Sequence, residues 1–424
     1  MTDIQSILLL TIFIGAFLAI ALEHITKVNK SWVAVFAGSL MWGIVVFGKG
    51  QDNIHTAIIH TTGEIFELVI FLMGAMTIVE MLGHYRFFTW LEIKLQSYNI
   101  SNTQLFWIIG LVTFISSAVL DNLTTTLVMI HIGKHLNFKK ENFNYFVINT
   151  VIAANAGGAM SPVGDVTTIM IWLADKFTAW QVLVGGLLPS IVGWVIPQYM
   201  ITKKLSKIHR EQVHYEEQMP LQWGVIVLGF STFGMAVSVN ILHLPPFFGI
   251  LFGLGIVAMV VDIKLRRGSL HIKANQLVNV VKEIDMGTMY FFVGILLAVG
   301  ALQFHGILGI LAEFIFGSDP ANNPLSVIIG HISLGFLSSV FDNVPLTAAV
   351  IQMLPDNIDY TLWVLLAITA GMGGSMTSIG SAAGVAAMGQ VKELTFVEYM
   401  KKGTIPALLG YIGAIITWIL IFYI

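Results

Sequence analysis

The chain has 424 residues, of which 56% are hydrophobic and only 11% are charged, with a net charge of −3 and a mean hydropathy of +0.83. Soluble proteins carry roughly 25% charged residues, so this composition excludes a soluble domain and predicts an all-α polytopic protein in a lipid bilayer, with no nucleic-acid partner. The chain has no cysteine, which excludes disulfides and thiolate metal sites.

Apolar runs long enough to cross a bilayer occur throughout the chain. The first run lacks a basic n-region and a small-residue cleavage site, so we interpret it as a span and not as a signal peptide. Ten spans are predicted, at residues 4–22, 31–48, 66–84, 145–174, 180–202, 222–241, 247–262, 286–304, 361–390 and 404–423.

Two further apolar stretches, residues 103–135 and 325–355, do not fit as single spans. Each carries an Asp-Asn pair near its middle, and each half is too short to cross a bilayer comfortably. Irregular backbone within a membrane is tolerated only against protein or water. We therefore predict two re-entrant hairpins, each of which enters and leaves on one side.

Two of the predicted spans contain sequence that interrupts a helix. Residues 145–174 include NAGGAMSPVGD, from Asn155 to Asp165, and residues 361–390 include GMGGSMTSIGS, from Gly371. A break leaves backbone carbonyls and amides unpaired, and in hydrocarbon only protein, water or a bound ion can satisfy them. We predict one broken helix in each half of the chain.

The distribution of basic residues tests this layout. With the N-terminus outside, only Lys49 and Lys176 of the 21 basic residues fall in outer loops, in agreement with the positive-inside rule. If either hairpin were a single span, every later loop would change sides. The residues assigned to inner loops are Lys27, Lys30, Arg86, Lys94, Lys134, Lys139, Lys140, Lys203, Lys204, Lys207, Arg210, Lys264, Arg266, Arg267, Lys273, Lys282, Lys392, Lys401 and Lys402.

The order of these elements occurs twice. Residues 1–202 and 221–424 each supply five spans and a hairpin after the third span, and residues 203–220 form a polar cytoplasmic linker. SSAVLDNLTTT in the first half matches SSVFDNVPLT in the second, and the two interrupted motifs match as well. Because the halves start on opposite sides, we predict inverted-topology repeats, an arrangement typical of transporters with a midplane binding site.

The breaks and the hairpin tips would gather oxygen atoms at that midplane. An oxygen-only cluster with one or two carboxylates suits a hard cation such as Na⁺ or Li⁺, and the same carboxylates could take up a proton. We expect the charged chemistry to centre on Asp121 and Asp165, because Ser381 stands where the first half has Asp165. The candidate residues are Asp121, Asn122, Thr124, Thr125, Asn155, Ser161, Asp165, Thr167, Thr168, Asp342, Asn343, Thr347, Thr377, Ser378 and Ser381.

Structural roles are open for several of these side chains. Asp121, Asp165 and Asp342 each precede a renewed helical run and could be N-caps, a role compatible with ion binding. The threonines could instead hydrogen-bond backwards to helix carbonyls. Glu67 is a further candidate for a proton path. For His131 and His135 we favour a hydrated interfacial position over pH sensing.

The motifs SSAVLDNLTTT, NAGGAMSPVGDVTTIMIW, FDNVPLTAAVIQM and GMGGSMTSIGS together resemble the NhaD-type Na⁺/H⁺ antiporters. These belong to an ion transporter superfamily that also contains arsenite permeases and dicarboxylate carriers. The resemblance implies a homodimer with a scaffold domain and a mobile transport domain that moves like an elevator, in a bacterial inner membrane. The positions that match polar residues needed for NhaD-type transport are Asp121, Asn155, Asp165, Thr167, Thr168, Ser338, Asn343, Ser378 and Ser381.

The resemblance thus favours exchange of Na⁺ and Li⁺ for H⁺, with Asp121, Asn155, Asp165, Thr167 and Thr168 as cation ligands and no cofactor or enzymatic activity. The alternative is a sodium-coupled dicarboxylate or arsenite permease of the same architecture. The hairpin tips read Asp-Asn, whereas the dicarboxylate branch has Ser-Asn-Thr, and no Lys or Arg stands at a tip or break. An intramembrane protease is disfavoured because SPVGD lacks the first glycine of Gly-x-Gly-Asp. A channel is disfavoured because inverted halves with two hairpins point to alternating access.

Overall fold

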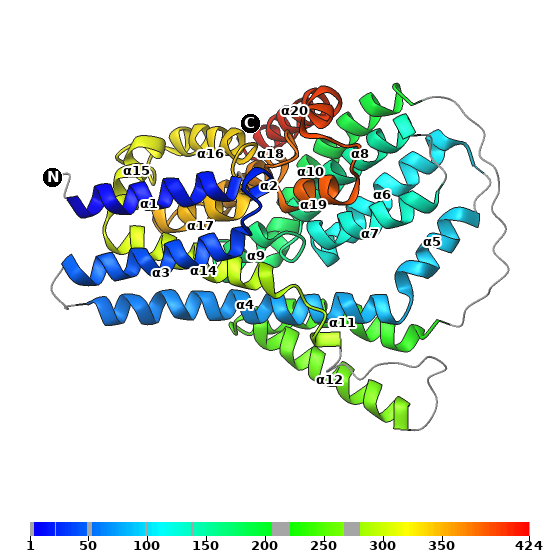
Figure 1. Cartoon of the computed structure of the whole chain (residues 1–424), viewed down its shortest axis with the longest axis horizontal. Coiled ribbons are helices and arrows are strands. Elements are labelled where there is room, and N and C mark those ends of the chain that lie inside the picture. The colour runs from blue at the N-terminus through cyan, green and yellow to red at the C-terminus, as the bar shows by residue number, and fades with distance from the viewer. Residues whose placement is uncertain are drawn as a thin grey trace.

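The computed structural model describes residues 4–21, 23–48, 53–97, 100–136, 140–205, 221–266 and 280–423. Within these ranges the regular secondary structure is α-helical (Figure 1). Most of the predicted linker, from residue 206 to residue 220, lies outside the described residues. The same holds for six basic residues used in the charge argument, namely Lys49, Lys139, Lys207, Arg210, Arg267 and Lys273.

The first half of the chain contains the predicted spans as helices, with the hairpin and the broken span each divided in two. Its helices are α1 (Ile4–Ala21), α2 (Glu23–Thr26), α3 (Lys30–Gly48), α4 (Ile54–His84), α5 (Phe87–Ser97), α6 (Asn102–Leu120), α7 (Asn122–His135), α8 (Lys140–Ala159), α9 (Val166–Leu173) and α10 (Ala179–Thr202).

The second half has the same order of long and divided helices. Its helices are α11 (Trp223–Ile241), α12 (Pro246–Arg266), α14 (Met286–Phe304), α15 (Ile307–Phe316), α16 (Pro324–Ser338), α17 (Asn343–Met353), α18 (Tyr360–Gly373), α19 (Ala382–Gln390) and α20 (Phe396–Phe422).

Among the residues that the structure describes, eight helices are long and apolar enough to cross a membrane: α3, α4, α6, α10, α11, α12, α14 and α20. Helix α1 is a shorter apolar helix, as is α18 in the second broken span. Helix α8 in the first broken span has 20 residues but is too polar to qualify, and α9 and α19 are too short. Two of the predicted boundaries are wrong. Helix α4 starts at Ile54 and not at residue 66, and α20 starts at Phe396 and not at residue 404. Both helices begin earlier than the apolar pattern indicates, because their first turns contain polar residues.

Helices α5 and α15 were not predicted. Each follows the third long helix of its half and precedes a divided hairpin stretch. Helix α15 is apolar but has only 10 residues, and the 11-residue α5 carries polar positions at Thr89, Glu92 and Lys94. Hydropathy over a span-length window does not detect helices this short.

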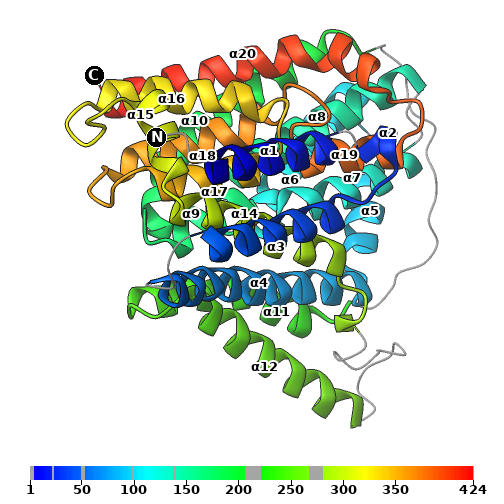
Figure 2. The same cartoon turned by 60° about the vertical axis from the view of Figure 1, so that its left-hand side comes forward.

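The two halves make the same helix pairings. Helix α3 packs on α14 as α12 packs on α4, α6 packs on α8 as α16 packs on α18, and α7 packs on α19 as α17 packs on α9. In Figure 2, α16 and α20 lie at the top and α11 and α12 at the bottom, with the short helices α7, α9, α17 and α19 between these layers. The short helices therefore meet near the middle of the molecule.

Candidate functional site

Both interrupted helices restart from a capping residue in extended backbone. Helix α8 ends at Ala159, and α9 restarts after Asp165, whose φ and ψ are −146° and 148°. In the second half, Ser381 has φ and ψ of −146° and 153° before α19. Asp165 Oδ1 accepts a hydrogen bond from the Thr167 amide at 3.2 Å, and Ser381 Oγ accepts one from the Gly384 amide at 3.2 Å. Both residues are therefore N-caps, one charged and one neutral.

Glycines bring each broken helix into backbone contact with the helix that precedes its hairpin tip. A Cβ at Gly157 would lie 2.1 Å from the carbonyl oxygen of Phe114 in α6. A Cβ at Gly373 would lie 2.1 Å from the carbonyl oxygen of Gly335 in α16. Real Cβ atoms do not approach an oxygen this closely, so both crossings require glycine.

A serine hydroxyl supports each of these crossings. Ser117 Oγ donates to the carbonyl of Ala154 at 2.6 Å, and Ser338 Oγ donates to the carbonyl of Ala370 at 2.8 Å. All four residues are buried. The predicted site residue Ser338 thus joins α16 to α18, because its hydroxyl group donates to a backbone carbonyl.

The two hairpin tips converge on Asp165. Asn122 Nδ2 in the first turn of α7 donates to Asp165 Oδ2 at 2.9 Å, and Asn343 Nδ2 in the first turn of α17 donates to the same oxygen at 3.3 Å. Asp165 is only 1% exposed. A carboxylate so deeply buried is therefore held by one amide from each half of the chain.

Asn155 extends this network to the second break. Its Nδ2 donates to Ser375 Oγ at 2.9 Å and to Ser381 Oγ at 3.0 Å, while its Oδ1 accepts from Asn122 Nδ2 at 3.0 Å. Ser375 was missed in the sequence analysis, although it lies within GMGGSMTSIGS. The register of the two motifs pairs it with the apolar Ala159, so no match to the first half marked it.

Asp121 does not take the central position expected for it. Its Oδ1 accepts from the Thr124 amide at 2.8 Å, and its Oδ2 accepts from Thr124 Oγ1 at 2.8 Å. Both carboxylate oxygens thus accept hydrogen bonds from the first turn of the helix that Asp121 caps. The neighbouring Asn122 makes the contact with Asp165 instead. The backbone of Asp121 has φ 73° and ψ 155°, a conformation that is costly for a residue with a side chain.

The second tip has a charge partner that the sequence analysis placed elsewhere. Asp342 caps α17 through the Val344 amide at 3.1 Å, and its Oδ2 lies 3.5 Å from Lys30 Nζ at the start of α3. The same ammonium lies 4.4 Å from the ring centroid of Phe291. Lys30 was assigned to an inner loop, but its side chain is only 23% exposed and pairs with the tip.

The predicted hydroxyl residues fall into two groups. Some serve the backbone: Thr168 donates to the Asp165 carbonyl at 2.8 Å, Thr347 donates to that of Asn343 at 2.9 Å, and Thr377 donates to that of Ser339. Ser161 Oγ accepts weakly from the Val163 amide at 3.4 Å. Among the described residues, the buried hydroxyls left without a hydrogen-bond partner include those of Thr125, Thr167 and Ser378.

These contacts leave the charge of Asp165 without a neighbouring formal positive charge in its hydrogen-bond set. Amide donors stabilise a carboxylate but do not neutralise it, and an uncompensated charge in a membrane interior is costly. A cation or a proton at Asp165 would remove that cost. The oxygens available beside it are those of Asn122, Asn155 and Asn343, which suit a hard cation better than a soft one.

Comparisons with known proteins place this architecture in a family. The citrate transporter family model matches residues 17–371. The chain is 32% identical to the Na⁺/H⁺ antiporter NhaD of Halomonas elongata over 99% of this chain and 89% of that protein. It is 34% identical to sodium/proton antiporter 1 of Arabidopsis thaliana over 98% of this chain and 72% of that protein.

A solved structure supports the fold. The crystal structure of the Alcanivorax borkumensis YdaH transporter is similar with a TM-score of 0.56 and 11% identity, over 92% of this chain and 98% of that one. Together with the long apolar helices, these matches make the chain an integral, multi-pass membrane protein. The chain belongs to the citrate transporter family and, within it, to the NhaD-type Na⁺/H⁺ antiporters.

Proposed function

We propose that this protein exchanges Na⁺, and also Li⁺, for H⁺, with Asp165 as the group that binds either the cation or the proton. The observation that carries the proposal is the position of Asp165, a buried carboxylate on which the two hairpin tips converge through Asn122 and Asn343. Because an empty and charged site is costly to move through a dry barrier, only the loaded or protonated site would cross. Exchange is then obligatory.

The side-chain amides of Asn122 and Asn343 can adapt to either a cation or a proton at Asp165. The Nδ2 groups of Asn122 and Asn343 both donate to Asp165 Oδ2. A half-turn of either amide exchanges nitrogen for oxygen at nearly the same position, because the two ends of the group are nearly equal in shape. We propose that both amides turn when a cation binds, so that their oxygens join Asp165 and Asn155 as ligands.

The unpartnered hydroxyls are the candidates for completing this shell. Thr167 follows Asp165 in α9, Thr125 lies in the first turns of α7, and Ser378 lies in the second break. Each is buried, and an orphaned buried hydroxyl is costly unless a ligand or water satisfies it. We assign Asp121, Thr124 and Thr168 to shaping the site, because their polar atoms serve helix caps.

We propose an elevator mechanism with inverted repeats, supported by the helix pairings shared between the two halves. The transport domain would contain α6–α10 and α16–α20, which carry the tips and breaks, and α1, α3, α4, α11, α12 and α14 would form the scaffold. The proposal includes a homodimer in a bacterial inner membrane with the N-terminus outside. The Lys30–Asp342 pair would then bridge scaffold and transport domain.

The alternative is an anion carrier, as the description of the matching family model suggests. Two features argue against it. Asp165 would repel an anion at the point where the tips converge, and Lys30 at the second tip is paired with Asp342. A dicarboxylate substrate would therefore have to displace an existing charge pair.

The test is cation-driven proton movement in proteoliposomes with an imposed pH gradient. Na⁺ or Li⁺ should collapse the gradient with the wild type, and Asp165→Asn should abolish the effect while keeping the folded protein, because asparagine can also cap α9. Gel filtration and thermal unfolding of the variant supply the folding control. If the folded wild type ignores both cations but transports succinate or arsenite, the antiporter proposal is wrong.

A further inference from the structure

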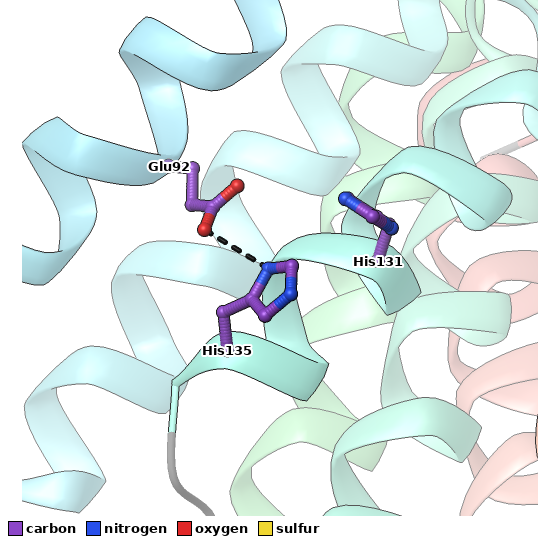
Figure 3. Close-up of side chains that lie close together, drawn as sticks. All are labelled: Glu92, His131 and His135. Atoms are coloured by element: carbon purple, nitrogen blue, oxygen red, sulfur yellow. Dashed lines mark ion pairs between the residues drawn. The ribbon is translucent and has the colours of Figure 1, made fainter.

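A second group of chemically active side chains lies away from the Asp165 network, between α5 and α7 (Figure 3). His131 and His135 stand one turn apart on α7, and Glu92 on α5 faces them. His135 Nδ1 lies 3.0 Å from Glu92 Oε1, and the two imidazole rings lie 4.9 Å apart at 89°. One ligand atom from each of the three residues lies within 4.8 Å of the others.

An ordinary ion pair does not account for this arrangement. Elsewhere His84 pairs with Glu283 and His60 with Glu64, and each of these ion pairs contains one histidine. Here His131 adds a second imidazole beside a pair that is already formed. Since two like imidazoles gain nothing from proximity when protonated, a shared ligand explains their convergence better than a charge pair does.

The donor set identifies the class of ligand. Two histidines at i and i+4 with one carboxylate form a typical three-residue set for Zn²⁺ or a similar transition metal, with bonds of about 2.0–2.2 Å. Tetrahedral geometry at that bond length separates ligand atoms by about 3.3 Å, close to the present Glu92–His135 distance of 3.0 Å. A modest rotation of His131 would close the set. Nitrogen ligands disfavour Ca²⁺ and Mg²⁺.

The surroundings provide access and a fourth position. Glu92 and His131 line a cavity of about 350 Å³ together with Phe88, Leu127 and Gln390. The side chain of His135 is 46% exposed, whereas that of Glu92 is only 12% exposed. A metal could therefore enter from solvent, and a water molecule could fill the fourth position, since the cavity is far larger than one water. The lack of cysteine removes any competing thiolate site.

We propose that Glu92, His131 and His135 form a binding site for a divalent transition metal such as Zn²⁺. The site joins α5 to α7, the helix that begins with Asn122. A metal held by both helices restricts the movement of the first hairpin relative to α5. Resting on the proposed antiport function, this predicts that micromolar Zn²⁺ slows the exchange.

Binding is measured first, on the purified full-length protein in metal-free buffer, by competition of Zn²⁺ with a chromophoric chelator. The wild type should bind one Zn²⁺ tightly, and His131→Asn and His135→Asn should each weaken that binding at least about tenfold. His84→Asn, which alters an ion pair that contains one histidine, is the matched control and should bind as the wild type does. Equal melting temperatures without metal would show that all variants are folded. If the wild type does not bind Zn²⁺, or if both α7 variants bind it as tightly as the wild type does, the proposed metal site is wrong.

Exchange is measured second, in proteoliposomes with and without Zn²⁺. Zn²⁺ should slow Na⁺-driven proton movement with the wild type and His84→Asn but not with His131→Asn. If Zn²⁺ binds tightly but does not slow the exchange, the metal site is supported and its proposed effect on the first hairpin is wrong. If Na⁺ drives no proton movement even without metal, the proposed function fails, and the binding measurement still decides the site.

Discussion

The two helix breaks have the same backbone and different chemistry. Asp165 and Ser381 share a φ of −146°, and both cap the second segment of their helix. Before each break, a glycine of the first segment lies against a backbone carbonyl of the helix that precedes the hairpin tip. Only the first break carries a charge. The comparison shows that the shape of a break and its charge come from different residues, the glycines and the capping side chain respectively.

The hairpin tips show the same division. Both begin with an aspartate that caps the following helix and an asparagine that donates to Asp165. Yet Asp121 accepts hydrogen bonds from the first turn of its own helix, whereas Asp342 also faces Lys30. Each half therefore contributes one amide to a carboxylate that belongs to the first half, and the surrounding charges differ.

The most direct way to break the comparison is Asp165→Ser, which gives both breaks a serine cap. Serine caps a helix as well as aspartate does, so the fold should survive. We expect Na⁺-driven proton movement to fall at least about 100-fold, equivalent to about 2.7 kcal/mol, because the buried carboxylate is lost. The control is Ser381→Ala, which should retain most activity. Similar losses for both variants would mean that the breaks are chemically equivalent.

The structural equivalence is tested by Gly157→Ala and Gly373→Ala. Each adds a Cβ that would lie 2.1 Å from a backbone carbonyl oxygen, so the helices must separate. Overpacking of this kind costs about 1–3 kcal/mol, and both variants should lower the melting temperature to a similar degree. Gly234→Ala, where a Cβ meets nothing within 4 Å, is the matched control. A large loss at one crossing and none at the other would contradict the shared geometry.

The contributions of the tips are compared with Asn122→Ala and Asn343→Ala. Each variant removes an amide oxygen that is proposed to bind the cation, and a polar contact to a charged group contributes about 1.5–3 kcal/mol, so we expect the apparent Na⁺ half-saturation concentration to rise about tenfold for Asn122→Ala. The rise should be smaller for Asn343→Ala, because its distance to Asp165 is 3.3 Å against 2.9 Å. Asn322→Ala, which alters an exposed contact with Asp319, serves as the control. Unchanged half-saturation in both tip variants would remove the amides from the site.

The smallest effect is expected from the charge pair present at the second tip. Lys30→Gln, Asp342→Asn and the double variant form a cycle of melting temperatures. Because both side chains stay partly exposed to solvent and Nζ lies 3.5 Å from Oδ2, a long distance for an ion pair, we expect a coupling near the lower end of the range for residues in contact, about 0.5–1 kcal/mol. Strictly additive single effects would show that the ammonium and the carboxylate do not interact.

Much of the fold could be predicted from the sequence, because helix breaks leave a local signal. Glycine, proline and aspartate inside apolar runs placed the interruptions at Asp121 and Asp165, where the structure has them. The duplicated motifs also gave the register that pairs Asp165 with Ser381. Short helices such as α5 were missed, since they are below the length that hydropathy detects.

The arrangement within the site could be predicted only in part. An intramembrane aspartate is conspicuous in a sequence, but the direction of its side chain depends on competing donors. The Thr124 amide and hydroxyl hold Asp121, and the adjacent Asn122 takes its place. Likewise, the contact between Asn155 and Ser375 depends on how α8 packs on the second break, and no local pattern encodes that packing.

The backbone contacts at the glycine crossings have an evolutionary consequence. The spacing of α6 and α8, and of α16 and α18, is set by main-chain atoms and glycines, and these contacts do not involve the side chain that caps the break. If the cap at Asp165 binds the cation as proposed, substitution at the capping positions would change the solute while the helix crossings stay the same. A lineage could then keep the glycines and exchange the two caps, and one inherited framework would yield carriers with different cargo.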